Sequence, residues 1–180
     1  MADNIYGIMA EFDTPTEMVD AARMVRDAGY TKTDAFSPFP LHEIDEALGI
    51  KRSILPYLIF AGGITGLLTA CVLTFGPSWF IYPLVVHGKP IDWRTVPAFF
   101  PIMFELTVLF SAFTSFFAML IMNGLPRWYH PIFNWNRFAR ATNDGFFLVI
   151  EARDPRFTET EAEQLLTETG GQHITVVHED

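Results

Sequence analysis

The chain contains 180 residues with 12 Lys or Arg against 21 Asp or Glu, giving a formal net charge of -9, and 50% of it is hydrophobic. This acidic balance argues against a nucleic-acid partner, because proteins that bind nucleic acid present a basic face to the phosphates. The single cysteine excludes an internal disulfide, a CxxC redox pair, a c-type haem attachment motif and a thiolate iron–sulfur site.

Charge and hydrophobicity lie in different segments of the chain. Residues 1–50 hold ten acidic and three basic residues, and residues 141–180 hold nine acidic and two basic ones. Residues 51–140 hold two acidic and seven basic residues. The sequence therefore predicts two acidic flanks around an apolar centre with basic ends.

The N-terminal flank is expected to form a strand, a helix and a second strand. Residues 5–12 are short and apolar, which indicates a strand. Thr-Pro-Thr-Glu at 14–17 supplies an N-cap, a proline at the first helical position and a glutamate at N3, which predicts a helix with a capping box. Gly29 ends this helix, and residues 30–37 follow as the second strand.

Two long apolar runs then predict a transmembrane hairpin. Residues 54–86 contain no charged residue, and residues 96–126 contain a single charged residue, Glu105. Each run exceeds the roughly 20 residues that cross a hydrocarbon core about 30 Å thick, so we place helices at about 54–79 and 97–125. A buried hairpin in a soluble protein is the alternative, but flanks of roughly 85 residues in all are too short to enclose it.

The C-terminal flank repeats the order of the N-terminal one. Residues 145–152 indicate a strand, Thr-Glu-Thr-Glu at 158–161 predicts a second capping box, and residues 173–178 indicate the last strand. Two β-α-β units that close one sheet form the ferredoxin-like arrangement. Neither flank carries enough apolar surface to fold alone, so we expect the two to share one sheet.

The expected fold is an α+β membrane protein in which a transmembrane hairpin interrupts a ferredoxin-like cytoplasmic domain. The first half of the domain and an elbow occupy 1–50, the hairpin with a short periplasmic loop occupies 51–126, and the second half occupies 127–180. Five basic residues flank the hairpin and two lie in its loop, which by the positive-inside rule places both termini in the cytoplasm. The flanking residues are Lys51, Arg52, Arg127, Arg137 and Arg140, and the loop residues are Lys89 and Arg94.

Small residues follow one side of each apolar helix. Gly62 and Gly66 form a GxxxG pair, a spacing that lets a second helix approach closely. The second helix carries a stripe of small side chains, which we expect to face this glycine pair. A partner subunit is the alternative neighbour for either stripe. The stripe consists of Thr107, Ser111, Thr114 and Ala118.

Glu105 is the candidate functional residue of the apolar part. An ionisable group at the centre of a membrane helix costs at least about 2.5 kcal/mol and usually faces protein or water. At 100° per residue, Glu105 lies on the side of Leu109 and away from Thr107 and Thr114. Three interpretations stay open: a polar contact with a partner membrane protein, a proton relay, and a neutral acid near the headgroups.

No residue pattern indicates a catalytic, metal or cofactor site. The five histidines lack the spacing of a metal-binding helix, and the sequence has no GxGxxG or Walker motif. The apolar runs contain no pair of histidines that could hold a b-type haem. We therefore expect a chain without a cofactor.

Four segments resemble the D-type subunit of bacterial alternative complex III, and the similarity covers residues 1–157. The resemblance implies a quinol-oxidising respiratory complex, unrelated to cytochrome bc1, that passes electrons to a periplasmic cytochrome c or to an associated oxidase. The segments are YGIMAEFDTP, SPFPLHEIDEALGIKRS, PRWYHPIFN and NDGFFLVIEA.

The resemblance also implies a non-catalytic accessory role in the bacterial inner membrane. Other subunits of such a complex carry the c-type haems, the iron–sulfur clusters and the quinol site. The two helices would pack against a large multi-helix quinol-binding subunit, stabilising the membrane core and lining part of a proton route. A membrane-anchored ferredoxin-like sensor is the alternative, although the flanks show no convergent polar or Cys/His residues and fold analogy alone is weak support.

The segments that adjoin the hairpin then have an expected role at the membrane surface. Residues 41–48 are expected to form a short interfacial helix with Ile44, Ala47 and Leu48 towards lipid or a partner. Residues 127–130 would hold the second membrane helix at the cytoplasmic surface.

Overall fold

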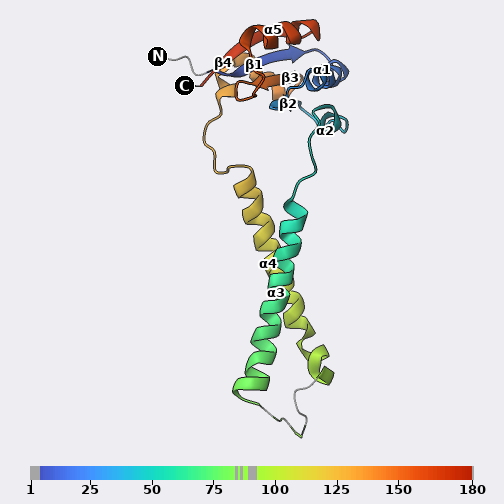
Figure 1. Ribbon diagram of the computed structural model, residues 1–180, viewed down its shortest axis with the longest axis vertical. Helices are drawn as coiled ribbons and strands as arrows, with labels where there is room; N and C mark the ends of the chain where they lie inside the picture. Colours follow the sequence, from blue (N-terminus) through green and yellow to red (C-terminus); the bar gives the residue numbers. More distant parts are fainter. Residues whose placement is uncertain (1–4, 84, 86, 89–92, 180) are drawn as a thin grey trace. The chain divides into compact units, whose positions relative to one another are not determined.

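The computed structural model of the chain describes residues 5–83, 85, 87, 88 and 93–179. The loop residues Lys89 and Asp92 therefore lie outside the described residues. The chain divides into two compact units, one that runs up to Lys51 and resumes at Trp128, and one at Arg52–Arg127 (Figure 1). We refer to the first unit as the sheet domain and to the second as the hairpin.

The sheet domain is built on a four-stranded antiparallel sheet with the strand order β2-β3-β1-β4. Strand β1 pairs with β3 on one side and with β4 on the other, so the N-terminal strand lies between two strands of the C-terminal flank. Strand β3 also pairs antiparallel with β2, which makes β1 and β2 parallel with β3 between them. The strands are β1 (Ile5–Phe12), β2 (Thr33–Phe36), β3 (Phe146–Glu151) and β4 (Gln172–His178).

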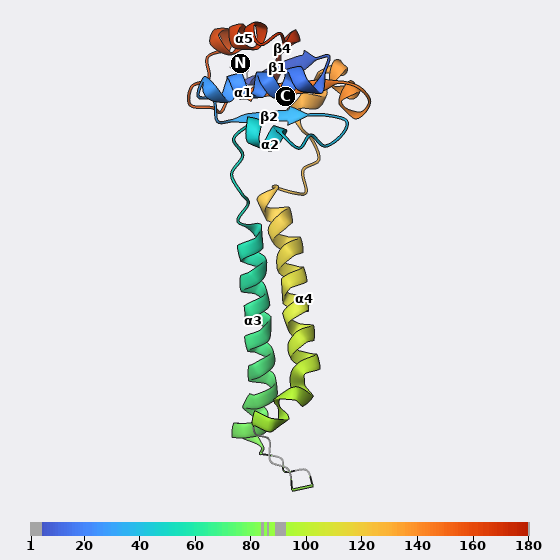
Figure 2. The same cartoon turned by 90° about the vertical axis from the view of Figure 1, so that its right-hand side faces the viewer.

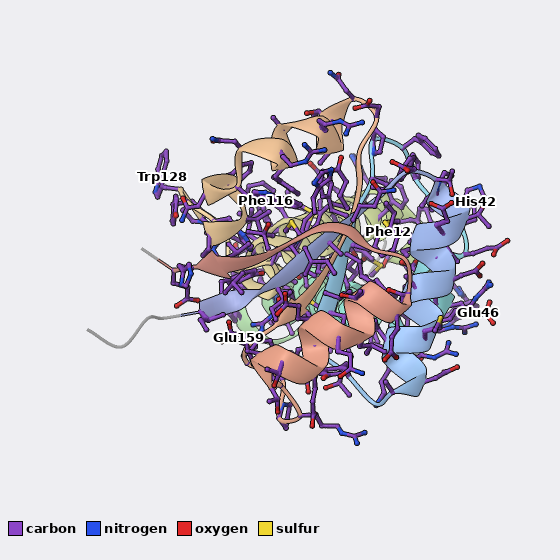
Figure 3. All side chains as sticks on the ribbon, turned by 90° about the horizontal axis from the view of Figure 1, so that it is seen from above. Phe12, His42, Glu46, Phe116, Trp128 and Glu159 are labelled. Atoms are coloured by element: carbon purple, nitrogen blue, oxygen red, sulfur yellow. The ribbon has the colours of Figure 1, made fainter. Side chains whose placement is uncertain are left out.

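Helices α1 (Pro15–Asp27) and α5 (Glu159–Glu168) cover one face of this sheet (Figures 2 and 3). Alternate side chains of β1 and β3 point to the same face, and those on this face form the larger core cluster with the two helices. This cluster includes Ile8, Ala10, Phe12, Met18, Val25, Leu148, Ile150, Ala162 and Leu166, all of them buried.

The opposite face of the sheet is covered by a segment that the sequence patterns did not predict. Two 3-10 helices, η3 (Pro131–Asn134) and η4 (Asn136–Thr142), lie here, and we refer to residues 131–142 as the 3-10 segment. Ile132 and Phe138 form a second core cluster with side chains of β1 and β3. The central strands β1 and β3 are therefore buried on both faces.

The two predicted capping boxes have different outcomes. At α1 the box is confirmed, because the Glu17 amide donates to Thr14 Oγ1 and the Thr14 amide donates to Glu17 Oε2, both at 3.3 Å. At α5 the prediction is wrong, because Thr158 occupies the N-cap position without a side-chain cap bond in the described structure. Thr158 and Glu161 are both exposed, so water can satisfy these groups and nothing requires the box to close.

The elbow also differs from its prediction. Helix α2 (Ile44–Ala47) is shorter than expected and packs against α1 (Figures 1 and 2). Ala47 is fully buried in the core of the sheet domain, with Ile44 and Leu48 packed around it, so these side chains do not face lipid or a partner. Burial of these apolar groups is reinforced by Arg26, whose Nη1 donates to a carbonyl of α2 at 2.8 Å.

The hairpin consists of two long helices, α3 (Leu55–Gly76) and α4 (Val96–Met122). A π-helical turn, η1 (Pro77–Ile81), extends α3, and a 3-10 turn, η2 (Trp93–Thr95), precedes α4. Both helical stretches are long and apolar enough to cross a membrane, by length and composition. Helix α4 ends three residues before the predicted end, because Gly124 adopts a positive φ of 63° just beyond it.

The Asp154 carboxylate links the C-terminal flank to the segment that precedes β2 in the N-terminal flank. The residue is 4% exposed, and one carboxylate oxygen accepts from the amides of Thr31 at 2.7 Å and Lys32 at 2.8 Å. The other oxygen accepts from the Arg156 amide at 2.9 Å. Burial acts to raise the pKa of Asp154, but these hydrogen bonds outweigh it and hold the pKa below its usual range.

We expect Asp154→Asn to lower the free energy of unfolding of the full chain in detergent by about 1.5–3 kcal/mol, because charged hydrogen bonds to buried amides are lost. Urea unfolding followed by tryptophan fluorescence measures this, with Glu163→Gln on the exposed side of α5 as the control. The lowered pKa makes the ionised carboxylate stabilising above the usual carboxyl pKa of about 4, and this contribution is lost as pH falls through the folded value. A wild-type advantage that persists at lower pH would contradict this account.

Candidate functional site

Three glycines of α3 bring α4 into close contact within the hairpin. A Cβ atom built on Gly62 would lie 2.8 Å from Thr114 Cβ, and one on Gly66 would lie 2.9 Å from the Leu106 carbonyl carbon. A Cβ on Gly63 would lie 2.7 Å from the hydroxyl oxygen of the facing serine of α4. These separations are shorter than van der Waals contact, so the observed approach requires glycine at 62 and 66, whereas at 63 the facing hydroxyl group could turn away from an added methyl group.

Most of the small residues singled out from the sequence lie on the contacting sides of the two helices. Thr114 faces Gly62, and Ser111 faces Gly63. Thr107 is more distant, with its methyl group 3.6 Å from a Cβ built on Gly63, and Ala118 is half-buried further along α4. The sequence pattern did not indicate Gly63, although it adjoins Gly62, because the GxxxG spacing selects Gly62 and Gly66.

Several hydroxyl groups on the hairpin donate to carbonyl groups of their own helices. Thr107 Oγ1 donates to the Met103 carbonyl at 2.6 Å, and Thr74 Oγ1 donates to the Ala70 carbonyl at 2.7 Å. Such bonds to the preceding turn are how Thr is accommodated in an apolar helix. In the described hairpin the α3–α4 contact therefore depends on close packing.

Glu105 lies on a side of α4 that α3 does not cover. Its side chain is exposed, whereas Leu106, Thr107 and Phe110 are half-buried against the neighbouring helix. Among the described residues Glu105 has no hydrogen bond or ion pair. Its neighbours on the exposed side are large and apolar, with Phe104 61% and Val108 48% exposed. This single carboxyl group in an apolar surface is thus available to a group outside the chain.

A polar cluster on the 3-10-segment face of the sheet was not predicted. Tyr6 Oη donates to Glu151 Oε1 at 3.3 Å and lies 3.4 Å from His130 Nε2. His130 Nδ1 accepts from the Ile132 amide at 3.4 Å, and Arg153 Nη2 donates to Glu151 at 3.0 Å. Burial, followed by the charge of Glu151, raises the pKa of Tyr6, which keeps its hydroxyl protonated.

A buried carboxylate holds η4 against the same face. The side chain of Glu11 is 4% exposed and accepts from Arg137 Nε at 2.7 Å and from Arg140 Nη1 at 2.5 Å. Arg140 also pairs with Asp144 at 2.8 Å. The residues that pair with Glu11 are more than 120 positions away along the chain, so no local pattern indicates them. Two of the five basic residues that flank the hairpin are therefore engaged inside the sheet domain.

Neither unit contains an evident cofactor site in the part of the chain that the structure describes. No group of three or more His, Cys, Asp or Glu residues there could hold a metal ion. The polar cluster and the Glu11 ion pairs are internally satisfied, so their geometry favours structural roles.

Comparison with known families gives a match over residues 6–176, which includes both flanks and the hairpin. The matching family is described as Alternative complex III, ActD subunit. The chain belongs to this family. The resemblance found in four segments of the sequence is thereby confirmed, and the match extends it into β4. No curated protein matches the chain.

As a member of the ActD family, the chain is a subunit of alternative complex III, and its partners are other subunits of that complex. This places it in the respiratory electron-transport chain. The family assignment concerns nearly the whole chain, so the sheet domain and the hairpin both belong to the ActD subunit.

For this ActD-family chain, we expect Gly66→Ala to destabilise the hairpin by roughly 1–3 kcal/mol, because the added methyl group overlaps the Leu106 backbone. Gly76→Ala is the matched control, since a Cβ there meets nothing within 4 Å among the described residues. SDS-titration unfolding of the purified chain measures both. Equal midpoints for the two variants would show that α3 and α4 do not approach each other in this way.

Proposed function

We propose that this chain is a cofactor-free, non-catalytic subunit that stabilises the membrane part of alternative complex III. A transmembrane hairpin at 51–126 carries a ferredoxin-like domain, formed by 1–50 and 127–180, on the cytoplasmic side of the bacterial inner membrane. The c-type haems, the iron–sulfur clusters and the quinol site belong to partner subunits. The observation that carries the proposal is the apolar surface that the hairpin leaves uncovered in a chain of this family.

The exposure of the hairpin supports insertion into a membrane. Although α3 and α4 are in contact, no residue of α4 is fully buried, and only four residues of α3 are. A soluble hairpin would have to cover such a surface, whereas lipid and neighbouring membrane helices accept it. Side chains more than half exposed include Phe60, Leu68, Val72, Leu73, Phe100, Phe104, Phe113, Phe116, Phe117 and Ile121.

The strand order supports the ferredoxin-like assignment. Each flank contributes one β-α-β unit, and in each unit a strand of the other flank lies between the two parallel strands. Both connecting helices pack on the same face of the sheet. These are the features of the split β-α-β arrangement.

The basic residues support the cytoplasmic orientation. The two ends of the hairpin that join the sheet domain are flanked by the basic residues Lys51, Arg52 and Arg127. Basic residues next to a membrane helix favour the cytoplasmic side for that end. Both flanks contribute strands to one sheet, so both ends of the hairpin must lie on the same side of any membrane that it crosses. An inner-membrane subunit with two crossings satisfies both conditions.

Within this function we assign Glu105 a polar contact with a multi-helix partner subunit, with a proton relay as the second role. The carboxyl group is exposed on α4 and lacks a partner among the described residues. Glu105 lies nine residues after the first residue of α4. At 1.5 Å per residue, this places it about 14 Å along the helix axis and inside the apolar stretch. A buried polar contact there offsets the cost of placing a carboxyl group in lipid.

Purification of the tagged chain from native membranes in mild detergent tests the assignment to the complex. We expect haem-containing and iron–sulfur subunits to co-purify, with quinol-oxidation activity and a haem-stained band on a native gel. Recovery of the chain without haem or quinol oxidation would reject the proposed function.

Substitution of Glu105 tests its contact with the partner. We expect Glu105→Leu to lower recovery of haem subunits with the tagged chain about three- to fifteenfold, with a smaller loss for Glu105→Gln, because the amide retains hydrogen-bonding groups. Val108→Leu, at a similar depth on α4, is the control. If Glu105→Gln assembles normally but slows turnover, the residue acts as a proton relay. Unchanged assembly and turnover in both Glu105 variants would reject both roles.

A further inference from the structure

The sheet domain carries an apolar groove along its β2 edge. Its volume is about 540 Å³, and two chain segments line it, residues 35–40 and the 3-10 segment. Phe36 and Phe133 each pack edge-on against Phe138, with ring centroids 5.1 Å and 5.6 Å apart. Phe133 nevertheless remains 70% exposed. The groove therefore presents aromatic surface that the domain itself does not cover.

Exposed apolar side chains of the sheet domain gather in the segments next to the hairpin. Six large apolar residues of the described domain are exposed, and five of them lie between residues 39 and 50 or between 128 and 133. Figure 3 shows Trp128 pointing away from the sheet, and this residue is 96% exposed. Two of these five residues line the groove, so its surface includes aromatic side chains that the described domain leaves uncovered. The five are Phe39, Ile50, Trp128, Tyr129 and Phe133, and the sixth is Met24 on α1.

The walls of the groove are held in place before any partner binds. Glu11 anchors η4 through Arg137 and Arg140, and Phe138 packs onto Phe147 of β3 with ring centroids 5.5 Å apart. On the other wall, Phe39 packs edge-on against Phe146 at 5.6 Å. A preformed groove binds at a lower entropic cost than one that must be ordered.

The sequence of the groove wall formed by residues 35–40 limits how a partner can bind. Strand β2 is an edge strand, but Pro38 and Pro40 follow it and have no amide hydrogen to offer an added strand. The groove is therefore suited to an inserted side chain and not to extension of the sheet.

Charge identifies the class of partner. The two flanks that form the sheet domain, 1–51 and 128–180, hold 19 acidic and eight basic residues. Such a domain is repelled by the anionic headgroups of the inner membrane, which disfavours lipid as the occupant. Cytoplasmic loops of multi-helix membrane proteins carry an excess of Lys and Arg, and their charge is complementary to this domain.

Asp34 supplies a local carboxylate for such a cation. It directly precedes the groove-lining residues of β2, and its side chain lies on the same face of the sheet as that of Phe36. In the described structure its carboxylate accepts only from the Ala35 amide, at 2.9 Å, and makes no ion pair with Lys or Arg. Asp34 is exposed, but desolvation by the groups around it, followed by the charge of Glu151, raises the pKa of its carboxyl group. The Ala35 amide and the charges of His130 and Arg153 act in the opposite direction without cancelling this shift, so an added cation would be favourable.

We propose that this groove receives an apolar side chain from a cytoplasmic loop of a multi-helix subunit of the complex, with a Lys or Arg of that loop paired to Asp34. The inference rests on the proposed function, because it requires the sheet domain to lie at the cytoplasmic side of the membrane. It adds a second contact, outside the membrane, to the one assigned to Glu105.

Photocrosslinking in the intact complex tests this contact. The photoreactive amino acid p-benzoylphenylalanine is placed at position 133 in the groove and, as the control, at position 24 on α1. After irradiation of membranes and purification through an affinity tag on the chain, mass spectrometry identifies the crosslinked peptide. We expect position 133 to crosslink to a Lys/Arg-containing cytoplasmic loop of a multi-helix subunit, and position 24 not to do so.

Two further variants measure how the groove and the carboxylate contribute. Asp34→Asn is expected to lower the yield of the position-133 crosslink about two- to fivefold, the range of an exposed ion pair. Phe39→Ala, which removes one aromatic wall, is expected to lower it roughly tenfold. Met24→Ala is the matched apolar control and leaves the yield unchanged.

The outcomes separate the failure of this inference from failure of the proposed function. If the tagged chain co-purifies with haem subunits but position 133 crosslinks only to lipid, to a second copy of the chain or to nothing, the groove contact is overturned and the proposed function stands. If haem subunits do not co-purify at all, both are overturned. Equal crosslinks from positions 24 and 133 to the same loop would also overturn the groove contact.

Discussion

The pairing of β1 with β3 and β4 is the constraint on which the rest of the structure depends. β1 comes from the first residues of the described chain, whereas both of its neighbours follow the hairpin. The sheet therefore cannot form until the chain has passed through the whole hairpin and supplied β3 and β4. The entropic cost of joining such distant segments rises only logarithmically with the length between them, so the insertion is tolerated. If the helices cross a membrane, they must cross it an even number of times.

The same sheet also explains why the chain after the hairpin is bound so firmly. The central strands β1 and β3 carry apolar side chains on both faces of the sheet, and α1 and α5 cover only one of these faces. The 3-10 segment covers the other, and the buried Glu11 is compensated by Arg137 and Arg140. Removing both cations would leave a buried carboxylate without a charged partner, which is costly. The arginines that contribute to the charge asymmetry around the hairpin thus also stabilise the sheet domain.

Local sequence patterns predicted the regular elements of this fold but not its long-range contacts. Alternation, capping and glycine stops located all four strands and the helices α1 and α5 of the sheet domain, and apolar length located α3 and α4. The 3-10 segment has no periodicity that would reveal it. The pairing of Glu11 with Arg137 joins residues 126 positions apart, and the Asp34 carboxylate beside the groove is recognisable only after the strand order is known. The wrong orientation assigned to α2 has a similar cause, because its apolar side chains can be satisfied by α1 as well as by lipid.

The way the hairpin uses its glycines limits how it can meet a partner. Gly62, Gly63 and Gly66 are already occupied by close contact with α4, so they cannot mediate a second close approach on that side. A partner helix must instead meet large side chains such as Phe104, and lipid tails solvate these as well as protein does. Apolar surface alone therefore gives little preference for one partner or register. In the proposed contact, the carboxyl group of Glu105 supplies that preference, because moving it from a polar partner into lipid carries a large penalty. In the proposed arrangement, packing between α3 and α4 stabilises the hairpin, and one exposed polar group makes its association with a partner specific.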